Sequence, residues 1–374
     1  MDKKGAKFSI GDSLNDSLVE FFKKLLNDEL FDSVLVPVKV PAGDSYAWVL
    51  LENAELLDDV NVLPPVMTVQ GGRALSSITK HGAAARKIAA VMRPCEVRAA
   101  IELAKLGQIE LENITLISYD CPGAMPLGDY LAAPEKGEKK FAEAVKKGDL
   151  ELMRKICKVC VNFGLTAPDI HLATTDGAGL MIPATEKGEE LLKTAGLKAD
   201  QDVSGWAKAI EKRKGDAEGA RKKLFETLAV ERTGMENLPA TFDKCLACHN
   251  CMRVCPICYC RRCYFEGDSI EKSPRQRLKH AAQKGSVRFS PDILLFQLGR
   301  MSHMSFSCVS CGMCEDACPV DIPVAQMFSL VADETQKMFD YVPGMNPDEA
   351  QPLRKFTKEK ELDEIERLTK DPLE

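Results

Sequence analysis

The sequence predicts an α/β domain followed by a mainly α-helical domain, and three observations support this division. Segments typical of strands and helices alternate over about the first 200 residues, as they do in α/β folds. Eleven of the fifteen cysteines then lie between Cys245 and Cys318. The composition also changes between Gly234 and Pro239. We therefore expect an α/β domain at 1–204, a charged helical linker at 205–238, a cysteine-rich helical domain at 239–342 and a charged tail at 343–374.

The first elements follow from the spacing of apolar residues. Apolar side chains recur at helical intervals over 14–30, which predicts an amphipathic helix. The runs 34–40 and 46–51 are short and apolar, which favours strands. The chain is thus expected to open with a helix and two strands.

The middle of the α/β domain is expected to continue the alternation. Residues 83–92 lead from a helix into a strand in this interpretation. Pro94 then opens a helix that runs to about Leu106, because a proline in the first helical turn gives up no hydrogen bond. A buried strand at 114–118 follows, and it ends at the segment 120–123.

The remainder of this domain has weaker signals. Residues 131–156 are charged and helical in pattern, and 169–173 resemble a strand. A glycine-containing turn is expected at 175–179. Thr185 is placed to cap a helix over 186–195, since its hydroxyl can accept a hydrogen bond from a free backbone N–H group.

A long charged segment at 206–232 is dense in Lys, Arg and Glu. It is expected to form a helix that links the two domains, or alternatively a surface helix of the first domain. In the second domain, Ser290, Pro291 and Asp292 form a helix-start signal between two groups of cysteines. This long interval favours an all-helical arrangement over a compact βαβ one.

The tail after Pro343 is charged and carries apolar residues at helical spacing. Such a helix would dock in a groove on a partner, or would cover the core of this chain instead.

The overall composition limits the classes of function. The formal net charge is −6, which does not suggest binding to nucleic acid. The chain also lacks a signal peptide and any long apolar stretch, so we expect a cytoplasmic protein without a transmembrane segment.

Two cysteine runs of the form Cys-x-x-Cys-x-x-Cys-x-x-x-Cys-Pro carry the strongest signal. The runs are Cys245, Cys248, Cys251 and Cys255, and Cys308, Cys311, Cys314 and Cys318. Three closely spaced thiolates hold three corners of one [4Fe–4S] cluster, and the cysteine before the proline reaches the other cluster. We therefore expect one cluster on Cys245, Cys248, Cys251 and Cys318 and another on Cys308, Cys311, Cys314 and Cys255.

Zinc is the alternative metal for these runs, because it also binds four thiolates. Its usual ligands come as two separated pairs, so the spacing favours iron–sulfur clusters. Between the runs lie three more thiols, Cys258, Cys260 and Cys263. They would either bind an extra metal or pack as buried thiols beside the clusters.

A second group of cysteines lies in the α/β domain. Cys157 and Cys160 form a Cys-x-x-Cys pair, and Cys95 lies at a predicted helix N-terminus, where the helix dipole favours a thiolate. Cys121 follows a predicted strand, a usual position for ligand-binding residues in α/β sheets. The spacing leaves two interpretations open: a metal site, or two inert cysteines and a redox pair.

Four short motifs follow one another in the α/β domain: Arg93 to Ala99, Asp120 to Gly123, Cys157 to Cys160 and Ala167 to Ile170. With these motifs the domain resembles the beta subunits of coenzyme F420-reducing hydrogenases and related formate dehydrogenases. It extends through most of residues 30–200. The cysteine-rich part instead resembles the helical dicluster domains of heterodisulfide reductase and succinate dehydrogenase iron–sulfur subunits, and it follows the first domain where many relatives have it first.

The resemblance implies an α/β flavin and iron–sulfur domain plus a mainly α-helical dicluster ferredoxin domain. It implies FAD and a third [4Fe–4S] cluster, whose candidate ligands are Cys95, Cys121, Cys157 and Cys160. The flavin would lie near Lys80, His81 and Gly82, where a lysine and backbone N–H groups can face phosphate. Simple surface charge is the alternative role for Lys80.

The sequence therefore predicts an electron-transfer subunit of an oxidoreductase complex. Clusters carry single electrons, and FAD exchanges hydride with a soluble carrier. The expected partners are catalytic or heterodisulfide-reductase-like subunits and that soluble electron carrier. A flavin-free cluster conduit is the main alternative, and a zinc-scaffolded interaction module is a distant one.

Overall fold

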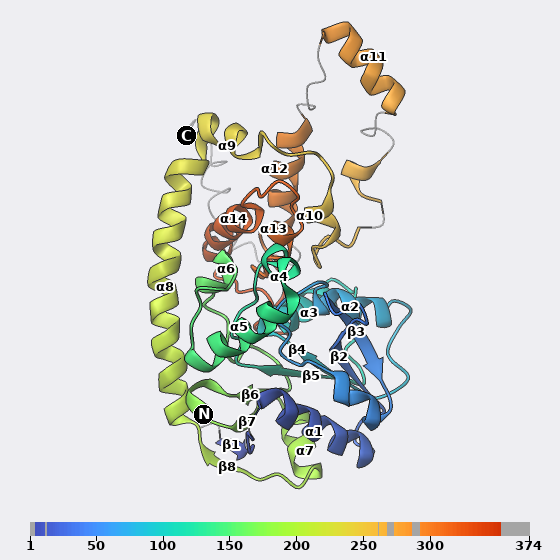
Figure 1. Cartoon of the computed structure of the whole chain (residues 1–374), viewed down its shortest axis with the longest axis vertical. Helices are drawn as coiled ribbons and strands as arrows, with labels where there is room; N and C mark the ends of the chain where they lie inside the picture. The colour runs from blue at the N-terminus through green and yellow to red at the C-terminus, as the bar shows by residue number, and fades with distance from the viewer. Residues whose placement is uncertain (1–3, 12, 261, 268–272, 286–291, 353–374) are drawn as a thin grey trace, which may run out of the picture.

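The computed structural model describes residues 4–11, 13–260, 262–267, 273–285 and 292–352. It contains a sheet-based unit and a helical unit, seen at the bottom and the top of Figure 1. One long helix, α8 (Ser204–Arg232), runs beside both units. The described residues therefore contain both the mixed α/β sheet and the additional helices that the predicted fold class calls for.

The sheet has eight strands in the order β3-β2-β4-β5-β6-β7-β1-β8. Strands β2, β4, β5 and β6 are parallel to one another, and the remaining pairings are antiparallel. The sheet is therefore mixed, with its parallel strands together. The strands are β1 (Lys4–Lys7), β2 (Ser33–Lys39), β3 (Tyr46–Leu51), β4 (Ile88–Met92), β5 (Ile114–Tyr119), β6 (Ile170–Ala173), β7 (Leu180–Pro183) and β8 (Ala199–Asp202).

Helices cover the sheet and then form the second unit. In the first unit they are α1 (Leu14–Asn27), α2 (Gly71–Ile78), α3 (Pro94–Lys105), α4 (Leu127–Ala132), α5 (Pro134–Lys147), α6 (Lys155–Lys158) and α7 (Glu186–Thr194), with short 3-10 turns η1 (Ala54–Asp59) and η2 (Thr175–Gly177). The second unit contains α9 (Gly234–Phe242), α10 (Asn250–Arg253), η3 (Tyr264–Glu266), α11 (Pro274–Lys284), α12 (Asp292–Met304), α13 (Met313–Asp316) and α14 (Val324–Met338).

Most predicted elements of the first unit are present, and one expectation is wrong. Residues 83–87 form no helix, and the chain enters β4 directly at Ile88. The segment from Gly234 to Pro239 forms most of α9, with the proline inside the helix. The predicted start signal at Ser290 and Pro291 lies outside the described residues, although α12 is described from Asp292.

The start of α3 follows from its sequence. Pro94 occupies the first turn, and the Glu96 carboxylate accepts a hydrogen bond from the Arg93 backbone N–H at 2.9 Å. The same carboxylate accepts from Gly71 N at 2.9 Å. One buried side chain therefore fixes the N-termini of both α2 and α3 at the carboxyl end of β4.

Helix α8 contacts both units at different points along its length. Near its start, Trp206 Nε1 donates a hydrogen bond to Asp120 Oδ2 at 2.8 Å, just after β5. Further along, Arg221 forms an ion pair with Asp333 of α14 at 3.2 Å. A continuous hydrophobic cluster also contains residues of both units, so they pack as one body.

The segment after α14 returns to the first unit and lies on α3. The buried Glu102 carboxylate accepts hydrogen bonds from Tyr341 Oη, Gly344 N and Gln351 Nε2. Gly344 has φ +71° and lies against the Arg98 backbone, where a Cβ atom would clash. The start of the predicted tail thus contacts this chain through Pro343, Gly344 and Gln351, while 353–374 lie outside the described residues.

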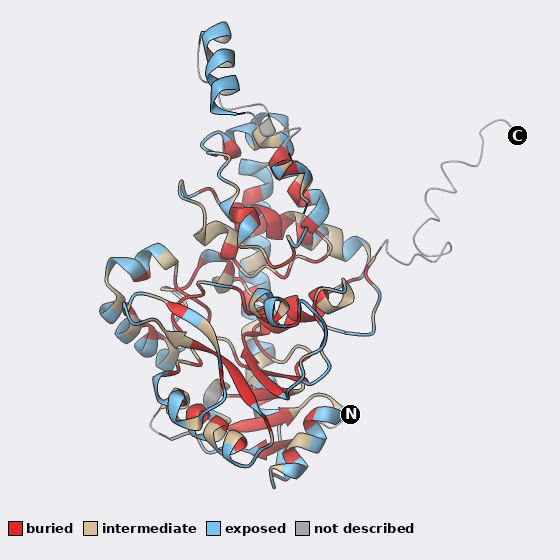
Figure 2. Cartoon of the chain, turned by 90° about the vertical axis from the view of Figure 1, so that its right-hand side faces the viewer, coloured by how far each residue is buried: buried red, intermediate tan, exposed pale blue. Residues whose placement is uncertain are grey.

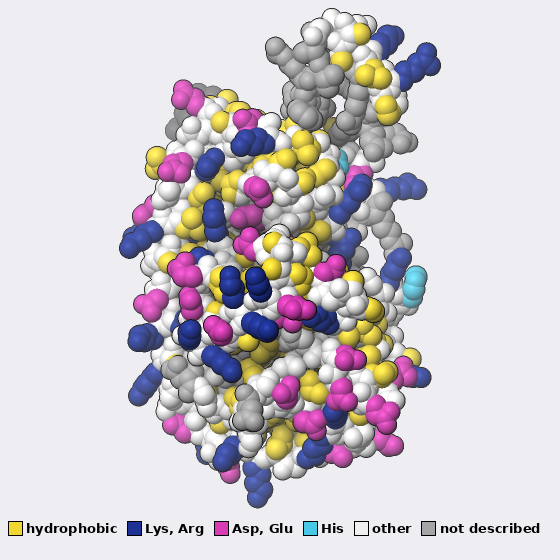
Figure 3. All heavy atoms as spheres, viewed as in Figure 1, with side chains coloured by type: hydrophobic (Ala, Val, Ile, Leu, Met, Phe, Trp, Pro, Cys, Tyr) yellow, Lys and Arg dark blue, Asp and Glu magenta, His cyan; other side chains and the backbone are white. Residues whose placement is uncertain are grey.

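The described surface is mixed in charge. Acidic and basic side chains are interspersed over the face in Figure 3. Helix α11 stands apart from both units in the two ribbon views (Figures 1 and 2), and most buried residues lie in the sheet and the inner helices (Figure 2). Within the described residues, no helix combines the length and the apolar character that crossing a membrane requires.

Candidate cluster sites

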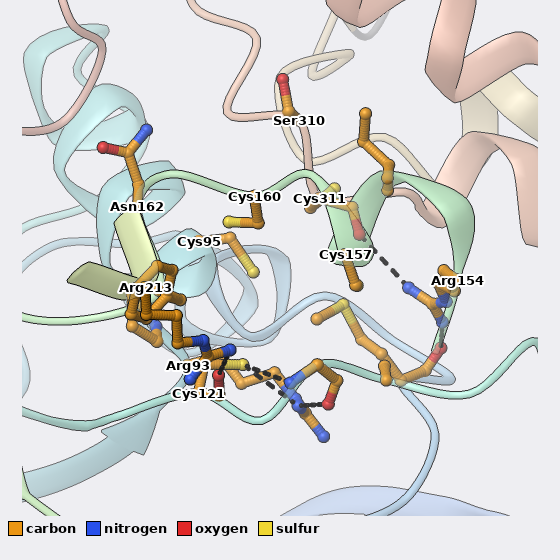
Figure 4. A pocket seen from close by; sticks show the side chains of 16 residues that line it. Arg93, Cys95, Cys121, Arg154, Cys157, Cys160, Asn162, Arg213, Ser310 and Cys311 are labelled. Atoms are coloured by element: carbon orange, nitrogen blue, oxygen red, sulfur yellow. Dashed lines mark hydrogen bonds between the residues drawn. The ribbon is translucent and has the colours of Figure 1, made fainter. Parts of the chain in front are cut away.

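Four thiols of the first unit line one cavity, shown in Figure 4. Cys95 lies in the first turn of α3, after β4, and Cys121 follows β5. Because β4 and β5 are parallel neighbours, their carboxyl ends bring these two cysteines together. Cys157 on α6 and Cys160 complete the group.

Backbone geometry brings α6 close to the Cys121 loop. Gly123 has φ +102°, and a Cβ atom there would lie 2.9 Å from Met153 and 3.3 Å from Cys157 Cβ. Gly123 N also donates a hydrogen bond to Cys121 Sγ at 3.4 Å. A glycine is therefore required in the Asp-Cys-Pro-Gly motif for both its conformation and this close approach.

Arginines surround the same cavity. Arg93 Nη1 lies 3.5 Å from Cys121 Sγ and donates to Gly123 O at 2.6 Å. Arg213 of α8 donates to Cys121 O at 2.9 Å, and its guanidinium lies 3.8 Å from the centre of the Phe163 ring. These cations favour a negatively charged occupant, such as a cluster bound by four thiolates.

Burial opposes ionisation of these thiols in the absence of a metal. It raises the pKa of Cys157 to about 11, although the charge of Arg154 acts in the opposite direction. Burial likewise raises the pKa values of Cys95 and Cys160. Metal binding would remove the protons, because thiolates are the metal-binding form of cysteine. The donor set therefore fits a buried metal cluster.

A second cavity lies in the helical unit and is also lined by four cysteines. They are Cys255, Cys308, Cys311 and Cys314. This is the grouping expected when the cysteine before a proline joins the other run. Ser310 and Cys311 line both this cavity and that of the first unit, so one short segment forms a common wall.

The two cysteine runs share one backbone conformation. Ala247 and His249 have positive φ values of 50° and 59°, and Ser310 and Gly312 have 55° and 82°. Each pair lies two and four residues after the first cysteine of its run. Alternation of left-handed and right-handed residues turns successive N–H groups toward one concave side, which suits an anion. Both loops are thus shaped alike for a cluster.

The remaining predicted group lies beside α12. Burial raises the pKa of Cys251, and the negative charges of Cys245, Cys248 and Cys318 raise it further. Gln297 Nε2 lies 3.7 Å from Cys245 Sγ, and Arg300 Nη1 lies 3.0 Å from Cys251 Sγ. The group therefore has polar donors directed at its sulfur atoms. Its members are Cys245, Cys248, Cys251 and Cys318.

The three additional thiols line a further cavity of about 430 Å³. Cys258 Sγ lies 3.4 Å from Met304 Sδ, Cys263 Sγ lies 3.8 Å from Met252 Sδ, and Cys260 is exposed. The Cys258 thiol also donates a hydrogen bond to Cys255, which lowers the pKa of Cys255 to about 6.

Mononuclear and cluster sites differ in the spacing of their thiolates. Four sulfur atoms around one zinc ion lie within about 4 Å of one another, since each Zn–S bond is about 2.3 Å. Among the described residues, no three His, Cys, Asp or Glu side chains are arranged to hold a single ion. A cubane takes one thiolate at each of four separate iron atoms, so its ligands stand farther apart.

The predicted flavin segment borders a polar cavity. Thr79, Lys80 and Gly82 line it together with Tyr259 and Cys260, and its volume is about 410 Å³. His81 is exposed and is not among the lining residues. Lys80 and Gly82 can therefore face a ligand in this cavity, and a contact from His81 remains a prediction.

Sequence reasoning missed the buried arginines of these sites. Arg93 and Arg154 stand just before ligand-type cysteines, and Arg300 is the single arginine within the largely apolar helix α12. A basic residue inside an apolar helical segment itself indicates a nearby anion, because an arginine is rarely buried without an anionic partner.

Comparison with known proteins shows which proteins this chain is similar to. Residues 208–322 match the model of the 4Fe-4S dicluster domain. A chain in the structure of the F420-reducing [NiFe] hydrogenase complex from Methanosarcina barkeri aligns with a TM-score of 0.43 and 10% identity, over 63% of this chain and 97% of that one.

Two curated relatives match nearly the whole chain. The F420-dependent formate dehydrogenase subunit beta of Methanocaldococcus jannaschii is 28% identical, over 88% of this chain and 92% of the relative. The F420-dependent formate dehydrogenase 1 subunit beta of Methanococcus maripaludis is 31% identical, over 90% and 92% respectively. The dicluster domain and these relatives define an iron–sulfur electron-transfer subunit of the oxidoreductase class. Within that class, the chain belongs to the family of F420-dependent formate dehydrogenase beta subunits.

Proposed function

We propose that this chain carries three [4Fe–4S] clusters and FAD, and that it passes electrons between a catalytic partner subunit and a soluble hydride carrier. The main support is the grouping of twelve cysteines into three sets of four, two of which line cavities with a common wall. When bound, FAD would supply two-electron hydride exchange and the clusters one-electron transfer.

The proposed ligands divide between the two units. The cluster of the first unit would be held by Cys95, Cys121, Cys157 and Cys160. In the helical unit, one cluster would be held by Cys255, Cys308, Cys311 and Cys314, and the other by Cys245, Cys248, Cys251 and Cys318. The chain's role is to hold these thiolates, to exclude water and to place the sites close together.

The common wall supports an order for the electron path. Ser310 and Cys311 border the cavity of the first unit and the Cys255-containing cavity. Arg154 reaches across the same boundary, since Nη1 donates to Cys311 O at 3.2 Å. We infer that electrons pass between the two units at this segment, and that the cluster near Cys251 lies beyond the one near Cys255.

The flavin would bind beside the polar cavity near Lys80. That side chain and the backbone around Gly82 would contact phosphate. The two curated relatives are F420-dependent, which makes the deazaflavin coenzyme F420 the first hydride carrier to test. The catalytic partner would be another subunit of a formate dehydrogenase complex, or a heterodisulfide-reductase-like subunit as the resemblance of the cysteine-rich part implies.

The test uses full-length protein purified without oxygen. Flavin released by denaturation is identified by chromatography, and reduced F420 is added to the intact protein while cluster absorbance is followed. We expect one FAD per chain and bleaching of the clusters. A Lys80→Ala variant should bind less FAD, with Lys87→Ala, in a segment that does not line the cavity, as the control. Clusters without flavin would instead establish the flavin-free conduit.

A further inference from the structure

Arg300 on α12 is a fully buried cation between the two cluster sites of the helical unit. Its relative exposure is 2%. Nη1 donates to Cys251 Sγ at 3.0 Å, and Nη2 donates to Cys251 O at 3.0 Å. The same side chain lines the cavity that contains Cys255 and Cys314. One guanidinium therefore borders both groups of proposed ligands.

The other described contacts of the Arg300 guanidinium are with aromatic rings and not with a carboxylate. Its guanidinium lies 4.6 Å from the ring centre of Phe328 and 5.7 Å from that of Phe296. Within the described part of the chain it forms no ion pair with Asp or Glu, and its Nε has no hydrogen-bond partner. A buried charge without an anion is strongly unfavourable, so the thiolates and their clusters are the available counter-charge.

We propose that Arg300 sets the reduction potentials of both clusters of the helical unit by stabilising their reduced states. This inference rests on the proposed cluster ligands. Each reduction adds one negative charge to a cluster, and a cation held nearby in a low-dielectric interior favours the more negative state. Hydrogen bonds to cluster sulfurs and local charge are established determinants of such potentials.

The position of Arg300 predicts which clusters respond. Replacement by a neutral residue should lower both potentials of the helical unit. The cluster of the first unit should not respond, because Arg300 does not line that cavity. That cluster therefore serves as an internal reference in the same sample.

The experiment compares wild type, Arg300→Met and Arg300→Lys as full-length, anaerobically purified proteins. Redox titrations are monitored by electron paramagnetic resonance of the reduced clusters, with iron content measured first. Arg253→Met is the matched control, because Arg253 is 65% exposed and already paired with Glu266 at 3.1 Å. Loss of that solvent-screened charge should leave both potentials close to those of wild type.

For Arg300→Met, we expect the ratio of reduced to oxidised cluster at a fixed potential to fall about tenfold, which is about 59 mV for one electron. Arg300→Lys should restore most of the shift, since it keeps the charge. Unchanged potentials in an Arg300→Met protein with full iron would overturn the inference. If Arg300→Met does not retain its clusters, Arg300→Lys and Arg300→Gln decide: equal potentials in these two would also overturn it. Wild type without clusters would instead refute the proposed function.

Discussion

Arg154 offers a sharp test of how the two units are held together. It lies on the α6 side of the boundary, and its side chain is 4% exposed. Its guanidinium forms an ion pair with Asp316 of α13 and donates to Cys311 O and Met67 O at 3.2 Å each. The change to test is Arg154→Met, which keeps much of the volume and removes every donor.

The expected effect of Arg154→Met on the rate of cluster loss follows from the burial of the ion pair between Arg154 and Asp316. The Asp316 side chain is 9% exposed, so the variant would leave a buried carboxylate without its cation. Removal of one partner from a buried ion pair costs about 3–5 kcal/mol. A barrier lowered by about 3 kcal/mol corresponds to a rate increase of roughly a hundredfold. We therefore expect at least a tenfold faster loss of the clusters.

The assay is the rate at which cluster absorbance disappears in denaturant without oxygen, because unfolding with cluster loss is irreversible. Lys158→Met is the matched control, at the end of the helix α6 that Arg154 immediately precedes. Lys158 pairs with Glu151 at 3.0 Å, but the Glu151 side chain is 85% exposed, so about 0–1 kcal/mol is expected.

The double variant Arg154→Met with Asp316→Asn should recover part of the loss, because it removes the stranded carboxylate as well. If Arg154→Met loses its clusters no faster than Lys158→Met, the described boundary does not depend on this buried pair. The reasoning from burial would then be refuted.

Three further variants test separate parts of the structure. Cys157→Ser should lower iron by about four atoms per chain and leave both clusters of the helical unit, whereas loss of all iron would show that the sites are not separable. Glu102→Ala would leave three buried donors unsatisfied at about 1–3 kcal/mol each, so amide exchange at 341–351 should become faster; unchanged protection would contradict the described packing. Cys258→Ser should retain wild-type iron, since a serine hydroxyl can still donate to Cys255, and loss of four irons would identify Cys258 as a ligand instead.

The spacing of residues in the sequence was most informative in the cysteine runs, where the chemistry of cluster binding fixes that spacing. The rule for the cysteine before a proline anticipated that Cys255 would join the other run around one cavity. Strand patterns likewise predicted a strand ahead of the helix that carries Cys95 and another ahead of Cys121, and the structure shows that these two strands are neighbours. Ligation itself remains a prediction in each case.

Other features could not be predicted because they depend on distant segments. Strands β1, β7 and β8 are too short for a reliable period, and each forms by pairing with strands distant in the sequence or equally short. The roles of Arg154 and Arg300 become apparent only in the folded structure, where each side chain contacts a segment that is distant in the sequence. The helix expected near residue 83 is absent: residues 83–87 are irregular and lead directly into β4.

The most direct test of the account is the iron and acid-labile sulfide content of the full-length protein, purified without oxygen. Three [4Fe–4S] clusters predict about 12 iron and 12 sulfide per chain, three times four. About 8 of each would retain the two clusters of the helical unit and contradict the one assigned to the cavity of Cys95, Cys121, Cys157 and Cys160. Stoichiometric zinc without sulfide would contradict the electron-transfer role altogether.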